Sequence, residues 1–206
     1  SSKNSSEKSR NNGYCEPFVG AGAVVLTIEP QVALLNDSNP HLINFHAWIQ
    51  NGIVDPAVRV DLFNTARIYL KKRDLFNGLA GPYRDTATAA VLFWYLNRTC
   101  FNGLCRFNRS GKFNVGYGKY KSVDYEGMIA TWPAYQPVMA GWDFQCGDFE
   151  LVRPKPGMFV YCDPPYDAGW VGYNGEGFAW TDHVRLAMWA DRHDGPVVIS
   201  NLATER

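Results

Sequence analysis

The stretch Cys15–Asp37, CEPFVGAGAVVLTIEPQVALLND, decides the fold class. It opens with a strand candidate over Cys15–Val19, which runs into a turn containing Gly20 and Gly22. The apolar run Ala23–Ile28 suits a helix, and Val32–Leu35 is a second buried strand candidate. Strand, glycine turn, helix and strand in this order are typical of an α/β sheet with parallel neighbouring strands.

The rest of the chain extends this pattern and interrupts it once. A helix is predicted from Pro40, capped by Ser38 or Asn39, and Thr86–Asn97 reads as a buried helix. Residues 55–75 indicate one or two amphipathic helices. Strand signals return at Trp142–Cys146, at Met158–Cys162 and at Val197–Ser200.

These elements predict a Rossmann-like α/β domain with an insertion. We expect residues 13–54 and 141–206 to form the α/β domain, and residues 55–140 to form an inserted region of helices and a β-hairpin. Residues 1–12 have no apolar period and are predicted to be a disordered tail.

Composition excludes several classes of protein. Of the 206 residues, 46% are hydrophobic, which is enough for a packed core. The longest apolar stretch, Ala89–Leu96, is far shorter than the roughly 20 residues of a membrane-spanning helix. The first 12 residues have no apolar core and do not resemble a signal peptide. We therefore expect a soluble cytoplasmic protein without a membrane partner.

The five cysteines form no CxxC pair and lie near no histidine at metal-ligand spacing. Their number and their mostly apolar surroundings favour reduced, buried thiols over a zinc site. No metal site is predicted from them or from the four histidines, which share no pattern.

A net charge of zero conceals an uneven distribution. The chain has 20 basic and 20 acidic residues, yet residues 97–121 contain six basic residues and no acidic one. Such a cationic segment in an otherwise acidic protein indicates a local anionic partner, although a solvated basic face would look the same by charge alone. Glycines and short aromatic pieces in this segment predict a hairpin with its turn at Arg109-Ser110-Gly111.

Two motifs carry chemistry. In the turn after the first strand, Gly20 and Gly22 allow close approach of a ligand, and Asp37 ends the next strand, where a carboxylate can hold ribose hydroxyls. This favours an adenosine-containing ligand, although a tight packing turn would show the same glycines. A pyrophosphate fingerprint with three glycines is absent, so a ligand without phosphate is favoured over a dinucleotide.

The second motif, Asp163-Pro164-Pro165-Tyr166, directly follows the strand candidate Met158–Cys162. Prolines lack backbone donors, so a rigid carbonyl and a carboxylate are left to accept both hydrogens of an amino group. The tyrosine ring offers a flat stacking surface. The arrangement suits a planar amine such as adenine that has been extruded from a nucleic-acid helix.

Three blocks of the sequence resemble the Dam-type family of DNA adenine-N6 methyltransferases, which use S-adenosylmethionine. They are EPFVGAG at 16–22, NRTCFNGLCRFNRSGKFNVGYGKYK at 97–121 and VYCDPPY at 160–166, in the order found in the family. The resemblance extends from about Gly13 to Asn201. It implies a methyltransferase that converts S-adenosylmethionine to S-adenosylhomocysteine, without a metal, while methylating a flipped adenine in duplex DNA, in a GATC-like site.

The resemblance also implies roles for individual residues. The implied cofactor-binding residues are Glu16, Pro17, Phe18, Gly20, Gly22, Asp37, Asp148 and Phe149. The implied catalytic residues are Asp163, Pro164, Pro165 and Tyr166. Asp163 and the Pro164 carbonyl would hold the target amino group while Tyr166 stacks on the base. Trp170 and Tyr173 are weaker candidates for covering that base.

In the basic segment, the resemblance implies that Phe101 and Asn102 fill the gap left by the extruded base, while Leu104 and Arg106 reach base edges. Arg106 would bind guanine. Five basic residues would meet phosphates: Arg98, Arg109, Lys112, Lys119 and Lys121. Asn108 is a further implied DNA-binding residue. Gly116 departs from the family pattern, which usually has a proline there that contacts a thymine methyl group.

Other departures support an alternative. The family's Lys-x-x-Gly-Gly-Lys segment has no counterpart in residues 1–12, the loop after Tyr166 is short, and the sequence stops at Arg206. The alternative is a catalytically inactive or truncated methyltransferase-like protein that binds DNA. A methyltransferase acting on RNA or protein is disfavoured by the basic segment and by Asp rather than Asn at position 163. Double-stranded DNA is the implied partner and a companion restriction endonuclease is a further candidate; the oligomeric state is left open.

Overall fold

A computed structural model describes residues 13–53, 62–79, 85–166 and 178–202. The chain forms two compact units. The sheet unit comprises residues 1–39, 141–169 and 178–206, and the helical unit comprises residues 40–140 and 170–177. The predicted tail, residues 1–12, lies outside the described residues.

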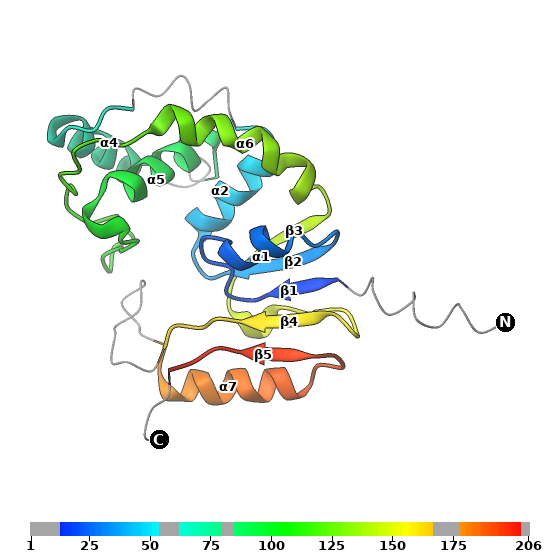
Figure 1. Cartoon of the computed structure of the whole chain (residues 1–206). Coiled ribbons are helices and arrows are strands. Elements are labelled where there is room, and N and C mark those ends of the chain that lie inside the picture. The colour runs from blue at the N-terminus through cyan, green and yellow to red at the C-terminus, as the bar shows by residue number, and fades with distance from the viewer. Residues whose placement is uncertain (1–12, 54–61, 80–84, 167–177, 203–206) are drawn as a thin grey trace. The chain divides into compact units, whose positions relative to one another are not determined.

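The sheet unit is built on five parallel strands (Figure 1). They are β1 (Tyr14–Glu16), β2 (Ala33–Asp37), β3 (Trp142–Cys146), β4 (Phe159–Cys162) and β5 (Val197–Ile199), in the spatial order β3-β2-β1-β4-β5. Cys15 of β1 pairs with Leu34 of β2 on one side and with Val160 of β4 on the other. The predicted α/β fold with a parallel sheet is therefore confirmed, and all five strands lie within two residues of their predicted bounds, except that β1 ends three residues early.

Helices α1 (Ala23–Ile28) and α7 (Trp180–Asp191) belong to the same unit. Leu186 and Trp189 of α7 pack in one buried cluster with Val160 and Cys162 of β4 and with Phe149 of the short helix η3 (Phe149–Leu151). The sequence prediction contains no helix at α7. Its opposite side exposes Trp180, Val184 and Met188, and apolar residues on both sides obscure the helical period.

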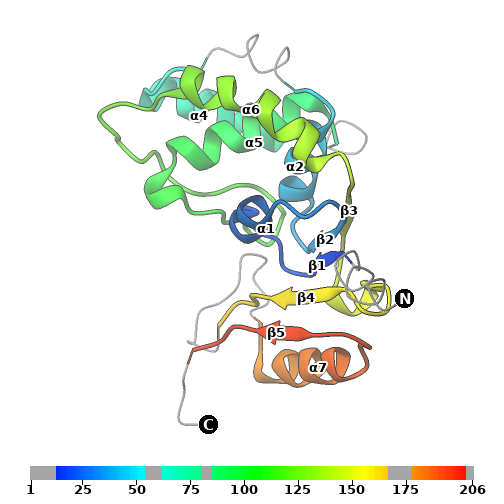
Figure 2. The same ribbon diagram turned by 45° about the vertical axis from the view of Figure 1, so that its right-hand side comes forward.

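The helical unit contains α2 (Pro40–Gln50), α4 (Ala66–Gly78), α5 (Ala87–Thr99) and α6 (Tyr125–Met139), which Figure 2 shows side by side. Every residue from Ala89 to Leu96 is buried, as the sequence predicts, and α5 contacts both α2 and α4. Helix α6 is also absent from the prediction, because Pro133 and Pro137 lie inside it and prolines normally interrupt helices.

The division between the units falls after Asn39, whereas the sequence suggests a boundary after residue 54. The reason is that α2 packs against α5 and α6. A local apolar pattern shows that a helix buries one side, but it does not identify the element that covers that side. The sequence therefore could not assign α2 to the inserted region.

The basic segment forms the predicted hairpin within the helical unit. Phe107 pairs with Phe113 in an isolated antiparallel bridge, and the Asn108 N–H donates to the Lys112 carbonyl at 2.9 Å. Between them Arg109, Ser110 and Gly111 make the turn, as predicted. Its entry is the 3-10 turn η2 (Phe101–Gly103).

Two further findings concern membrane-spanning helices and the cysteines. No helix in the described ranges is long and apolar enough to cross a membrane. All five cysteines are free thiols. Cys15, Cys100 and Cys162 are buried as expected, but Cys105 is half-buried and Cys146 is exposed because it ends β3 at the rim of the sheet.

Candidate active site

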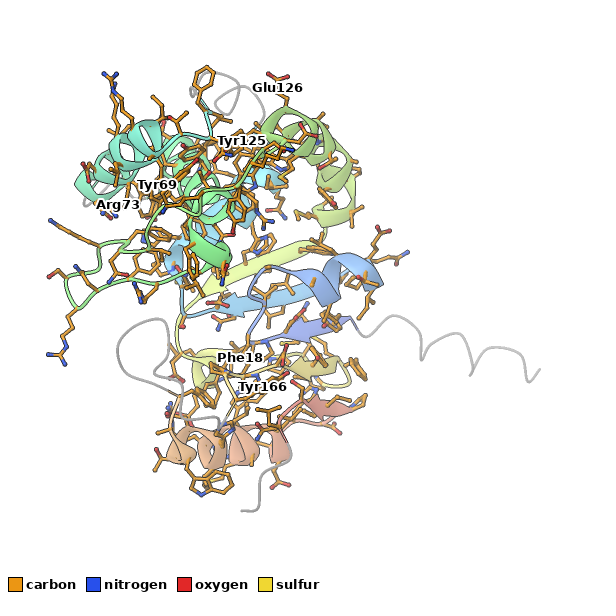
Figure 3. All side chains as sticks on the ribbon, turned by 60° about the vertical axis from the view of Figure 1, so that its left-hand side comes forward. Phe18, Tyr69, Arg73, Tyr125, Glu126 and Tyr166 are labelled. Atoms are coloured by element: carbon orange, nitrogen blue, oxygen red, sulfur yellow. The ribbon has the colours of Figure 1, made fainter. Side chains whose placement is uncertain are left out.

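Parallel strands bring the two chemistry-bearing motifs to the same edge of the sheet. Because all five strands run in one direction, their carboxyl ends share an edge, and β1 and β4 are neighbours. The glycine turn leaves β1 and the Asp163–Tyr166 elbow leaves β4. Figure 3 labels Phe18 and Tyr166, one from each turn, at this edge. Open α/β sheets bind ligands at such a point, where the strand order reverses.

The glycine turn has the backbone that its sequence suggests. Gly20 and Gly22 have φ angles of 49° and 76°, in the left-handed region that favours glycine. The Gly20 N–H donates to Oδ2 of Asp37 at 2.9 Å, and Oδ1 of Asp37 accepts from the Asn39 N–H at 2.8 Å. A Cβ placed on Gly20 would meet nothing within 4 Å, so the turn has open space beside it.

Asn36 also ties this edge together, although the sequence analysis did not single it out. Its side-chain Nδ2 donates to the backbone carbonyls of Pro17 and Gly147, each at 3.0 Å. The backbone carbonyl of Asn36 accepts from the Val19 N–H at 2.8 Å. Its only sequence signal is a polar residue at the end of a buried strand. These bonds link the turns that follow β1 and β3.

Three aromatic rings lie together at this edge. The Phe18 ring is 5.3 Å from the Phe149 ring and 5.7 Å from the Phe178 ring, which meets it edge to face. Phe149 is buried, whereas Phe18 and Phe178 are half-buried. Phe178, which precedes α7, was missed because nothing local distinguishes it from a packing residue. Half-buried rings of this kind can hold a purine by stacking.

Glu16, at the end of β1, is almost completely buried, with 2% of its surface exposed. The Tyr14 hydroxyl donates to its Oε2 at 3.0 Å. Burial raises the pKa of Glu16 to about 7; the Tyr14 hydrogen bond opposes this shift, and the charge of Asp163 adds to it. The interaction with Asp163 agrees with the neighbouring positions of the two turns.

This raised pKa makes the stability of the protein depend on pH. Between about pH 4.5 and 7 the folded state keeps the Glu16 proton that the unfolded chain loses, so stability falls as pH rises. Between pH 5 and pH 8 we expect the wild type to lose about 2 to 3 kcal/mol relative to Glu16→Gln. Urea unfolding of both proteins at the two pH values measures this difference, and identical pH dependence would contradict it.

The elbow after β4 places a carboxylate with two hydroxyl partners. Oδ1 of Asp163 accepts from the Tyr166 hydroxyl at 2.9 Å and from the Ser200 hydroxyl. Ser200 follows β5, and its N–H donates to the Cys162 carbonyl at 2.9 Å. Among the described residues both contacts fall on Oδ1, which leaves Oδ2 available to a ligand. Ser200 was missed because its proximity depends on β5 lying beside β4.

Asp148, which follows β3, is bound by Arg185 of α7. Its Oδ1 accepts from the Glu150 N–H at 2.8 Å and from Arg185 at 3.0 Å. The Arg185 guanidinium also lies over the Phe149 ring, 5.0 Å from the centroid. Arg185 was not a candidate residue, because α7 itself was not predicted. All eight predicted cofactor residues lie in the sheet unit, on or just beyond β1, β2 and β3.

The predicted DNA-binding residues lie in the helical unit, on the hairpin and the end of α5. The buried Phe113 and Val115 attach the hairpin to α4: Asn77 exchanges two hydrogen bonds with the Phe113 backbone, and the Tyr69 hydroxyl donates to the Val115 carbonyl at 2.8 Å. Figure 3 labels Tyr69 on α4. Leu104 is half-buried and the other nine are exposed: Arg98, Phe101, Asn102, Arg106, Asn108, Arg109, Lys112, Lys119 and Lys121.

Two of these side chains have partners inside the hairpin. Nε of Arg106 donates to Oδ1 of Asn114 at 2.9 Å, which orients the guanidinium. Oδ1 of Asn108 accepts from the N–H groups of Ser110 and Lys112, each at 3.0 Å, so this side chain also closes the turn. A Cβ at the exposed Gly116 would meet nothing within 4 Å. The candidates Trp170 and Tyr173 lie outside the described residues.

The part of the chain that the structure describes contains no cluster of metal-binding side chains. No group of three or more His, Cys, Asp or Glu side chains there could hold a metal ion. The chemical groups that the structure describes at the carboxyl edge are a glycine turn, aromatic rings and separate carboxylates.

A parallel sheet of this order, with a glycine turn after β1 and an acidic elbow after β4, has the architecture of an α/β methyltransferase. A model of the D12 class N6 adenine-specific DNA methyltransferase family matches residues 3–206. The chain belongs to this family and is an N6-adenine DNA methyltransferase, as its motifs indicate.

Several named proteins are similar to the chain. The DNA N-6-adenine-methyltransferase of Escherichia phage P1 is 38% identical over 200 residues, 90% of this chain but only 26% of that protein. The DNA adenine methylase of Serratia marcescens is 36% identical over 207 residues, 92% of this chain and 74% of the relative. The retron Ec67 DNA adenine methylase of Escherichia coli is 35% identical, with 92% and 68% covered.

Proposed function

We propose that this chain transfers a methyl group from S-adenosylmethionine to N6 of an adenine that is flipped out of duplex DNA, in a GATC-like site. The observation that carries the proposal is the placement of the glycine turn and the Asp163–Tyr166 elbow at the ends of neighbouring strands. A methyl donor and its acceptor must meet within reacting distance.

The cofactor side of the site has the groups that an adenosine needs. Open space beside Gly20 admits a ligand close to the backbone, and the carboxylate of Asp37, held by two N–H groups, can accept from ribose hydroxyls. Phe18 and Phe149 would contact the adenine ring and Asp148 its amino group. When bound, S-adenosylmethionine supplies the activated methyl group.

On the target side, the elbow holds and polarises the acceptor amine. Adenine N6 is a poor nucleophile because its lone pair is delocalised into the ring. Oδ2 of Asp163 and the Pro164 carbonyl would accept its two N–H groups, which favours a pyramidal nitrogen and stabilises the positive charge that develops on it. Tyr166, 40% exposed, would stack on the base. Asp163 need not be a strong base, since the proton can leave after transfer.

The helical unit would read the DNA. Phe101, half of whose surface is exposed on η2, would occupy the gap left by the flipped adenine, with Asn102 beside it. Leu104 and Arg106 would reach base edges. The other exposed basic side chains of this region, such as Arg109 and Lys112, would neutralise phosphates, which adds affinity without sequence information. Because the relatives are bacterial and phage proteins, the expected place of action is the bacterial cytoplasm, with a companion restriction endonuclease as a candidate partner.

Arg106→Ala is expected to weaken binding to the target duplex by roughly 1–3 kcal/mol and to relax discrimination at one base pair. The reason is that a guanidinium held by Asn114 can make a bidentate contact with guanine. Binding to duplexes with single-base changes measures the effect. The matched control is Lys119→Ala, which should weaken all duplexes alike and lower the salt dependence of binding. Uniform weakening by Arg106→Ala would identify a phosphate contact instead.

One experiment tests the function as a whole. DNA containing GATC and control sites is incubated with the purified chain and S-adenosylmethionine and then sequenced for N6-methyladenine. We expect modification at one short motif that contains an adenine. Duplex binding without cofactor binding or methylation would instead support the DNA-binding alternative.

A further inference from the structure

Arg185 of α7 joins four groups around the turn that follows β3. Its Nη2 donates to Oε2 of Glu150 at 2.7 Å and to Oδ1 of Asp148 at 3.0 Å, and its Nη1 donates to Oδ1 of Asp182 at 2.8 Å. The guanidinium carbon lies 5.0 Å from the centre of the Phe149 ring. All of these residues belong to the sheet unit.

Stability alone does not account for this arrangement. The Arg185 side chain is 38% exposed and that of Asp148 is 45% exposed, and a single ion pair so accessible to water contributes little to folding. The network also concentrates three carboxylates around a single cation. Without that cation, the carboxylates of Asp148 and Glu150 would repel each other, and Asp148 would lose one of the two contacts that orient its side chain.

The contacts of Arg185 determine which oxygen of Asp148 is left for a ligand in the turn after β3. Both contacts to Asp148 fall on Oδ1, from the Glu150 N–H and from Arg185, so that Oδ2 has no contact among the described residues. The same guanidinium lies over the Phe149 ring, which also packs against the rings of Phe18, Phe178 and Trp189. One side chain therefore contacts both the acceptor and the ring that the proposed function assigns to the adenine of the cofactor.

We propose that Arg185 is a positioning residue for cofactor recognition: by holding Asp148 and Phe149, it gives the site its preference for a purine that carries an amino group. The inference rests on the proposed function, because it assumes that S-adenosylmethionine binds at this edge. Arg185 acts through Asp148 and makes no contact with the reacting atoms.

The test compares two ligands on the full chain by calorimetry. One is S-adenosylhomocysteine, and the other is its analogue with hydrogen in place of the adenine amino group. We expect the wild type to prefer S-adenosylhomocysteine about tenfold. Arg185→Leu should weaken this ligand about tenfold and the analogue less than twofold, so that the preference disappears. The matched control is Arg192→Leu, at the end of the same helix, which should change neither value.

The outcomes separate this inference from the proposed function. If the wild type binds neither ligand, the proposed function itself fails. If the wild type binds both ligands equally, or if Arg185→Leu keeps the preference or weakens both ligands alike, the inference is overturned while the function stands. Thermal unfolding shows whether Arg185→Leu is folded. If it is not, Arg185→Lys decides: a lysine cannot bridge both carboxylates and cover the ring, so full retention of the preference would overturn the inference.

Discussion

Replacing Asp163 by alanine is expected to reduce methyl transfer by a factor on the order of 10³ while leaving the affinity for S-adenosylmethionine close to that of the wild type. The carboxylate lies on the elbow after β4, and among the described residues its Oδ1 is taken by Tyr166 and Ser200. Alanine removes the acceptor for the target amine and the negative charge that stabilises the charge developing on nitrogen. Among the described residues, Asp163 makes no hydrogen bond to a predicted cofactor residue, although its charge acts on Glu16.

Single-turnover methylation of a duplex, with cofactor affinity measured separately, tests this expectation. Asp143→Ala is the matched control, because Asp143 is an exposed carboxylate in β3 of the same sheet. Ser200→Ala should slow the transfer less, since the carboxylate remains but loses one of its hydroxyl partners. Undiminished turnover by Asp163→Ala would refute the assignment of the acceptor.

The second large effect is expected at Asp37. Asp37→Ala should weaken S-adenosylmethionine binding by about 10²- to 10³-fold, because hydrogen bonds to a charged group contribute roughly 1.5–3 kcal/mol each. The variant loses the ribose acceptor, and it also loses the bond at 2.9 Å that holds the Gly20 N–H and shapes the glycine turn.

Calorimetry with S-adenosylhomocysteine measures this loss without requiring turnover. At saturating cofactor the transfer rate of Asp37→Ala should recover, which distinguishes it from Asp163→Ala. The variant is also expected to bind duplex DNA normally, because the predicted DNA contacts lie in the helical unit. Unchanged cofactor affinity would remove Asp37 from the binding site.

The sequence predicted the sheet well because its signals are local. An apolar run that ends in glycines, or in Asp-Pro-Pro-Tyr, marks the end of a buried strand, and in a parallel sheet all such ends share an edge. The boundary of the inserted region stays a prediction; the compact units divide after Asn39, because α2 packs against α5 and α6. The roles of the individual site residues stay predictions that the variants described above test.

By itself, then, the sequence determined the α/β class, the strand ends that the two motifs follow and the exposed basic hairpin. Only the tertiary structure decided which residues support that edge: Ser200 reaches Asp163 across 37 positions, Arg185 reaches Asp148 across 37, and Asn36 reaches Gly147 across 111. Such contacts depend on the order in which strands pair and on how a helix packs. That order is set by the burial of the whole chain, and no short stretch of sequence encodes it.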